Sequence, residues 1–129
     1  MTVASRLRPW ARAAFLAYAL ALVTLTHWPN LAIDGPVPRT DLWIHIGAFG
    51  LWASLLGLCA FFGAWLSWRN IALTWFVALL YATLDETTQG LPGIGRHVAL
   101  DDWFGNALGI TLACGAMALL ARTRRGSRP

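Results

Sequence analysis

Apolar residues gather in four long runs, and most polar residues fall in the breaks between them. A helix needs about 20 apolar residues to cross a membrane, so each run has roughly the length of one pass. Two of the breaks are rich in Pro and Gly, which end helices, and the third is a short turn at 67–70. The pattern predicts an all-α membrane protein built as a four-helix transmembrane bundle, with passes near 10–28, 41–66, 71–88 and 102–121.

Four passes with short loops use nearly all of the chain. We therefore expect a basic N-terminal segment at 1–9, one membrane domain at 10–121 and a basic tail at 122–129. The first run also fits a cleaved signal peptide, because it follows arginines. Its length, and the lack of a small-x-small site after it, favour a retained anchor.

Composition supports a membrane location. Of the 129 residues, 57% are hydrophobic and 12% are charged, whereas about 25% are charged in a typical soluble domain. A net charge of +4 raises the question of nucleic acid as a partner. The basic residues, however, stand beside the apolar runs, where anionic lipid headgroups attract them. The expected partner is therefore the lipid bilayer, and no nucleic acid is expected.

The arginines are distributed unequally between the two sides of the predicted bundle. Two of them, Arg39 and Arg96, belong to the side that holds the breaks at 29–40 and 90–101. The other side holds both termini and the 67–70 turn, and its arginines are Arg6, Arg8, Arg12, Arg69, Arg122, Arg124, Arg125 and Arg128. Since cytoplasmic loops carry the excess of arginine, both termini are predicted to be cytoplasmic and the other side extracytoplasmic.

Three of the runs carry polar pairs close to their extracytoplasmic ends. Residues spaced three or four apart share one face of a helix, so each pair forms a short polar stripe. The pairs are Asp41 with His45, Glu86 with Gln89, and Asp102 with Asn106. Convergence of the three stripes would create one polar pocket.

Glu86 is the most informative member of this set. A carboxylate in the membrane core costs about 3 kcal/mol even on insertion scales, so Glu86 should point into the bundle and have a partner. Arg96, in the nearby break, can pair with a carboxylate through two hydrogen bonds. The predicted site thus consists of Asp41, His45, Glu86, Gln89, Arg96, Asp102 and Asn106.

Three roles remain open for this site. It can bind a polar ligand, it can only hold the helices together, or it can catalyse a reaction. Catalysis would use Glu86 or His45 as general base and Arg96 as an anion clamp. One histidine with scattered carboxylates is a poor metal site, so we expect no metal and no cofactor.

Small residues predict close helix packing. Gly105 and Gly109 form a G-x-x-x-G pair, and Gly50 and Ser54 have the same spacing. Such pairs let helix backbones approach each other, here within one molecule rather than between two copies.

The ordered motif Asp41-x3-His45, Glu86-x2-Gln89, Pro92, Arg96, Asp102-x3-Asn106-x2-Gly109 resembles the VanZ-like family of small bacterial membrane proteins. The resemblance covers roughly residues 40–120. It implies four passes in the bacterial cytoplasmic membrane and a site made of those motif residues. The chain departs from the family at Leu42, where lysine is common, and at Phe49, where tyrosine is common.

The namesake of this family is associated with resistance to the glycopeptide teicoplanin, and that property is not extended to this chain. The expected function is recognition or modification of a polar cell-envelope component, such as a lipid-linked precursor. The alternative is a structural or partner-binding membrane protein whose polar cluster only joins the helices. The sequence indicates neither the ligand nor the oligomeric state.

Overall fold

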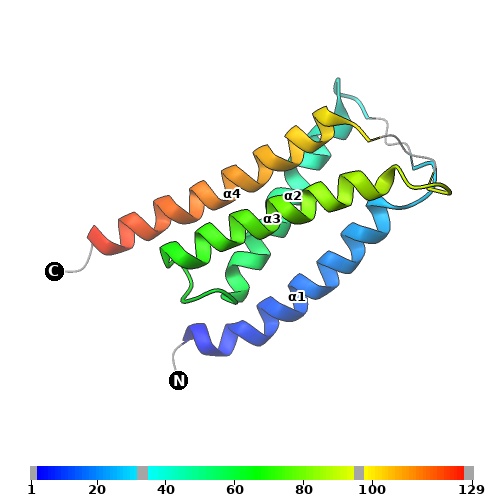
Figure 1. Ribbon diagram of the computed structural model, residues 1–129. Coiled ribbons are helices and arrows are strands. Elements are labelled where there is room, and N and C mark those ends of the chain that lie inside the picture. The colour runs from blue at the N-terminus through cyan, green and yellow to red at the C-terminus, as the bar shows by residue number, and fades with distance from the viewer. Residues whose placement is uncertain (1–2, 32–34, 95–97, 127–129) are drawn as a thin grey trace.

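The protein is all-helical. The computed structural model describes residues 3–31, 35–94 and 98–126, which form four helices and no strand. The helices run alongside one another as an elongated bundle (Figure 1). Their bounds are α1 Val3–Thr26, α2 Thr40–Cys59, α3 Trp68–Gln89 and α4 Leu100–Gly126. The prediction of an all-α fold is confirmed.

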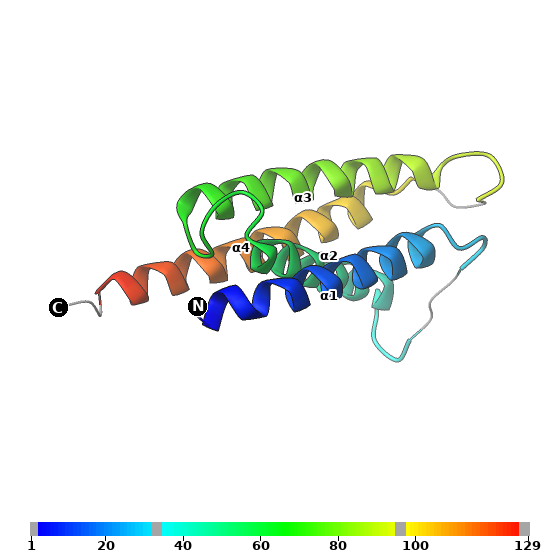
Figure 2. The ribbon, with the colours of Figure 1, turned by 90° about the horizontal axis from the view of Figure 1, so that it is seen from below.

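The bundle has two distinct ends. At one end, here called the terminal end, lie the start of α1, the end of α4 and the connection 60–67 between α2 and α3 (Figures 1 and 2). The other, here called the loop end, holds the ends of α1 and α3 and the starts of α2 and α4. Helix α2 contacts all three other helices and packs most extensively against α4.

Three of the helices are long and apolar enough to cross a membrane, which suggests a membrane protein. The apolar stretches are Arg8–Thr26, Thr40–Cys59 and Leu100–Gly126. Large apolar side chains are exposed on all four helices, as at Leu16, Leu51 and Leu112. A soluble monomer rarely exposes so much contiguous apolar surface, whereas lipid would cover it at no cost.

Helix α2 is shorter than the apolar pattern predicted. The expected pass at 41–66 ends as a helix at Cys59, because Ala60 adopts a left-handed conformation with φ 53°. The chain then bends through Gly63, with φ 155°, and Leu66, with φ 64°. Residues 60–66 are apolar and contain no Pro, so the sequence offers no strong stop signal. The apolar pattern did not predict that α2 would end before Ala60, a non-glycine residue in the left-handed conformation.

The prediction of a short turn at 67–70 is also wrong, because residues 68–70 already belong to α3. Ser67 is the N-cap of α3, and its side chain accepts a hydrogen bond from the backbone N–H of Asn70. The Asn70 side chain is fully buried, donates to Gly57 O (2.9 Å) and accepts from Phe62 N (3.3 Å). Gly57 O also accepts from Ala60 N (3.2 Å), so Asn70 adds a second hydrogen bond to this carbonyl at the end of α2 and fixes the 60–67 connection.

The small residues form the α2–α4 contact. A Cβ placed on Gly109 would lie 2.0 Å from Ile46 O, and one on Gly50 would lie 3.1 Å from Gly109 O. Backbone meets backbone here, which only glycine permits. The prediction of close packing within one molecule is confirmed for these glycines.

The helices that start at the loop end carry acidic residues in their first turns. Arg39 is the N-cap of α2, with a left-handed φ of 56° and no side-chain capping bond, and Asp41 follows in the first turn. Asp101 and Asp102 lie in the first turn of α4. Acidic groups in a first turn are favourable, because they face the positive end of the helix dipole.

Candidate functional site

Side chains from α2, α3 and α4 meet at the loop end, as predicted. His45 Nδ1 lies 2.9 Å from Asn106 Oδ1, and His45 Nε2 lies 3.7 Å from Asp102 Oδ2. Glu86 is close enough to His45 and Asp102 to interact with both charges. These four residues, His45, Glu86, Asp102 and Asn106, are called the His45 cluster below.

The His45 cluster leaves two buried polar atoms unpaired. Glu86 accepts a hydrogen bond from Ala99 N through Oε1 (2.8 Å), but its Oε2 has no partner among the described residues. Asn106 Nδ2 likewise has none. Glu86 and Asn106 are both almost fully buried. An unpaired buried polar group costs about 1–3 kcal/mol, and more when it is charged, so the cluster keeps one acceptor and one donor at a cost to stability.

The contacts of His45 orient its imidazole ring. Its two ring nitrogens face Asn106 Oδ1 and the Asp102 carboxylate, which are both acceptors in the assigned amide orientation. An imidazolium ring satisfies both contacts, because each nitrogen then carries a proton. A neutral ring satisfies one of the two contacts. Either state orients the imidazole firmly between α2 and α4.

Asp41 does not join the cluster. Its side chain is 47% exposed and lies 3.6 Å from the Arg39 guanidinium, which also donates a hydrogen bond to Asp101. The hydrogen bond to Asp101 is the main cause that raises the pKa of Arg39. Arg39, Asp41 and Asp101 thus form a surface network that links the starts of α2 and α4. Exposed pairs of this kind contribute little to stability.

Gln89 lies in a different cluster from Glu86. Its Nε2 donates to Asp85 Oδ2 (3.0 Å), and Asp85 also accepts from Thr26 Oγ1 (2.9 Å) and Tyr81 Oη (3.3 Å). His27 Nδ1 lies 3.7 Å from the same carboxylate. The Asp85 cluster, defined as Thr26, His27, Tyr81, Asp85 and Gln89, joins the end of α1 to α3.

The sequence pattern did not predict the Asp85 cluster. Asp85 and Gln89 are four residues apart and share a face, a spacing as good as that of Glu86 and Gln89. His27 also contacts Thr88 Oγ1 through Nε2 (2.9 Å), so it has partners that no local motif indicated. The Asp85 carboxylate is paired at both oxygens, which makes this cluster a structural joint between helices.

Arg96 lies outside the described residues, so its predicted pairing with Glu86 or Asp102 stays a prediction.

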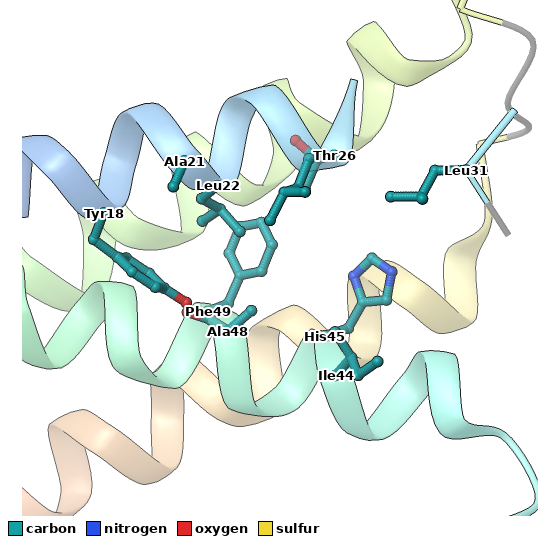
Figure 3. Close-up of a pocket in the computed structure, with 10 residues that line it drawn as sticks. Tyr18, Ala21, Leu22, Thr26, Leu31, Ile44, His45, Ala48 and Phe49 are labelled. Carbon is teal, nitrogen blue, oxygen red and sulfur yellow. Dashed lines mark hydrogen bonds between the residues drawn. The ribbon is translucent and has the colours of Figure 1, made fainter. Parts of the chain in front are cut away.

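An apolar groove between α1 and α2 ends at both clusters. It has a volume of about 290 Å³ and is open along one side. Figure 3 shows His45 and Thr26 at one end of the groove and Tyr18 at the other, with Phe49 between them. Tyr18 donates its hydroxyl hydrogen bond to Ala48 O (3.0 Å), so the remaining wall is apolar. The groove combines an apolar length with a polar end.

The described residues contain no group of three His, Cys, Asp or Glu side chains placed to hold a metal ion. The His45 cluster offers groups for hydrogen bonding and proton exchange. Glu86 Oε2 can accept a hydrogen bond or a proton, and a protonated His45 would form an ion pair with Asp102.

No protein-family model, no curated protein and no solved structure matches the chain. The fold and site thus define an all-helical protein with three candidate membrane helices and a buried polar cluster. The likeness to the VanZ-like family rests on the motif residues alone and stays a proposal.

Proposed function

We propose that this chain is a VanZ-like membrane protein that recognises a lipid-linked polar component of the bacterial cell envelope. The observation behind the proposal is the His45 cluster: His45 lines the polar end of an open apolar groove, and behind it Glu86 and Asn106 each carry a buried polar atom without a partner among the described residues. The apolar part of the ligand occupies the groove. Its polar part, which carries hydroxyl, amide or amine donors, reaches the cluster at His45.

The proposal includes a fourth membrane pass. Helix α3 is less apolar than the others, but its polar side chains Asp85, Glu86 and Gln89 are buried inside the bundle. Its outward face carries Phe76 and Leu80, which are exposed and four residues apart. The low overall hydropathy of α3 thus reflects its inner face, and its outer face suits lipid.

The proposed orientation places the loop end outside the cytoplasm. Described arginines at the terminal end include Arg8, Arg69 and Arg122, whereas Arg39 is the described arginine at the loop end. Arginine excess marks the cytoplasmic side. The His45 cluster then lies in the outer part of the bacterial inner membrane, within reach of envelope precursors.

The groove has a size that suits one lipid chain segment. Its volume of about 290 Å³ holds about ten groups of the size of a water molecule, and a methylene group is of similar size. A lipid chain of about ten methylene groups would fill the groove. The polar part of the ligand would then lie at the polar end of the groove, beside His45 and Thr26.

The alternative is that the His45 cluster only joins α2, α3 and α4. The Asp85 cluster shows what such a joint looks like, because both oxygens of its carboxylate are paired. The His45 cluster differs in its two unpaired atoms. Protein interiors seldom keep such atoms where stability is the only requirement.

The substitution Glu86→Gln distinguishes ligand recognition by the His45 cluster from a purely structural role. The amide keeps an oxygen that accepts from Ala99 N and replaces the unpaired carboxyl oxygen Oε2 by an amide donor. Wild type and variant are purified in detergent, and their unfolding temperature and labelling by a photoreactive glycosyl diacylglycerol are measured. Asp101→Asn, which removes a surface carboxylate at the same end, is the control.

Recognition predicts that Glu86→Gln raises or preserves the unfolding temperature while labelling falls, and that Asp101→Asn labels like wild type. A purely structural cluster predicts the opposite for Glu86→Gln, namely a lower unfolding temperature with labelling unchanged in the folded fraction. Unchanged labelling in a well-folded Glu86→Gln protein would reject the proposed recognition.

A further inference from the structure

A second pocket lies at the terminal end, far from the His45 cluster. It is formed by the 60–67 connection and the last turns of α4, and its volume is about 390 Å³. Its lining residues are Trp65, Leu66, Ala121, Arg124 and Arg125. The proposed recognition of an envelope component makes no use of this pocket.

The polar side chains of this pocket are all hydrogen-bond donors. The indole Nε1 of Trp65 is buried and has no hydrogen-bond partner among the described residues. Arg124 stacks its guanidinium over the Trp65 ring, 4.9 Å from the ring centroid. Arg125 is the next residue on α4 and lines the same pocket. The stacking holds one cation in place while its N–H groups stay available.

No acidic side chain in the described part of the chain pairs with these donors. Its acidic side chains all lie at the loop end, where Asp85 and Glu86 are buried and Asp41 and Asp101 are paired with Arg39. A buried indole N–H without an acceptor costs about 1–3 kcal/mol. A ligand that accepts hydrogen bonds and carries negative charge removes this cost.

We propose that the pocket of Trp65, Arg124 and Arg125 binds the phosphate group of a phospholipid headgroup. A phosphate presents several acceptor oxygens and negative charge, and arginine pairs with it through two parallel hydrogen bonds. The volume of about 390 Å³ holds about a dozen water-sized groups, enough for the phosphate and its neighbouring atoms.

The position of the pocket favours a lipid as the source of the phosphate. Arg124 and Arg125 lie in the last turn of α4, shortly after the exposed Leu119 and Leu120. In a membrane this is the level of the headgroups. A lipid held there would cover the exposed leucines with its chains and meet the two arginines with its phosphate.

Native mass spectrometry of the detergent-purified protein tests this proposal. The probes are phosphatidylglycerol, diacylglycerol of the same chain length, and inorganic phosphate. Three variants are compared with wild type. Trp65→Phe removes only the indole donor, the pair Arg124→Gln with Arg125→Gln removes the cations of the pocket, and the pair Arg69→Gln with Arg122→Gln removes equal charge from exposed positions at the same end.

Wild type should bind phosphatidylglycerol and not diacylglycerol. The Trp65→Phe variant should bind it about tenfold more weakly, since one hydrogen bond to a charged group is worth about that much. The Arg124/Arg125 pair should lose binding, and the Arg69/Arg122 pair should keep it. Binding of inorganic phosphate at equal affinity would support the phosphate site and assign it to a soluble ligand.

Two results would overturn the proposal. Equal losses in both arginine pairs would show that only the general charge of this end attracts lipid. Unchanged binding in Trp65→Phe, with an unchanged unfolding temperature, would show that the indole donor does not face a ligand.

Discussion

The contact between α2 and α4 gives the sharpest prediction about the fold, and Gly109→Ala tests it. The added Cβ would lie 2.0 Å from Ile46 O and 3.0 Å from Gly50 N. Both neighbours are backbone atoms that cannot rotate away. Helix α4 would therefore have to move from α2 by about 1 Å before the contact becomes tolerable.

The cost follows from this displacement. Overpacking at a contact that cannot relax costs about 3 kcal/mol, the upper part of the usual range. The hydrogen bond between His45 and Asn106, 2.9 Å long, joins the same two helices, and its loss adds about 1 kcal/mol. Together these are a large share of the roughly 5–15 kcal/mol that holds a domain folded.

Gly115→Ala is the matched control, because a Cβ there meets nothing within 4 Å. Alanine is the better helix former, so this variant should be as stable as wild type or more stable by up to about 1 kcal/mol. The assay is denaturant unfolding in detergent micelles, followed by helical circular dichroism. Equal stability of the Gly109→Ala and Gly115→Ala proteins would refute the close α2–α4 contact.

Three further predictions concern the rest of the molecule. Asn70→Ala should lower stability by about 1–3 kcal/mol, since Phe62 N–H loses its partner while Gly57 O keeps the bond from Ala60 N. Thermal unfolding measures the change, and a wild-type melting curve would contradict the role given to Asn70. Asp85→Asn should loosen the end of α1, because one carboxylate oxygen is replaced by an amide N–H donor and the hydrogen bond from Thr26 is weakened. Protease cleavage near residue 27 should then become faster. An unchanged cleavage rate would argue against the Asp85 cluster as a structural contact between α1 and α3. A cysteine at Pro36 should react with an impermeant thiol reagent in intact cells and one at Gly126 only after lysis, and the reverse pattern would overturn the proposed orientation.

The sequence predicted the helices well where polar residues bounded them. The ends of α1 and α3 lie within two residues of the expected positions, because breaks rich in Pro and Gly follow both helices. The end of α2 was misplaced by seven residues, because residues 60–66 stay apolar after the helix has stopped. What ends α2 is a left-handed Ala60 supported by Asn70 from the next helix, a tertiary effect that a hydrophobic pattern does not contain.

The candidate site was predicted in part for a similar reason. Helical spacing correctly placed His45 and Asn106 on facing stripes, since a buried polar group on one helix needs a partner on another. The same spacing could not decide between Glu86 and Asp85 as the neighbour of Gln89. That choice depends on how α3 is rotated against α1, where Thr26 supplies the hydroxyl that Asp85 accepts.

Mapping of lipid contacts in the groove tests the central claim most directly. The photoreactive glycosyl diacylglycerol is cross-linked to the protein in a bilayer, and the modified residues are identified by mass spectrometry. Ala21→Phe narrows the groove from α1, and Ala14→Phe makes the same change two turns earlier, outside the groove lining. The account predicts that cross-links concentrate on the groove, that they fall in Ala21→Phe, and that they persist in Ala14→Phe. Cross-links spread evenly over the exposed faces of all four helices, with both variants like wild type, would contradict it.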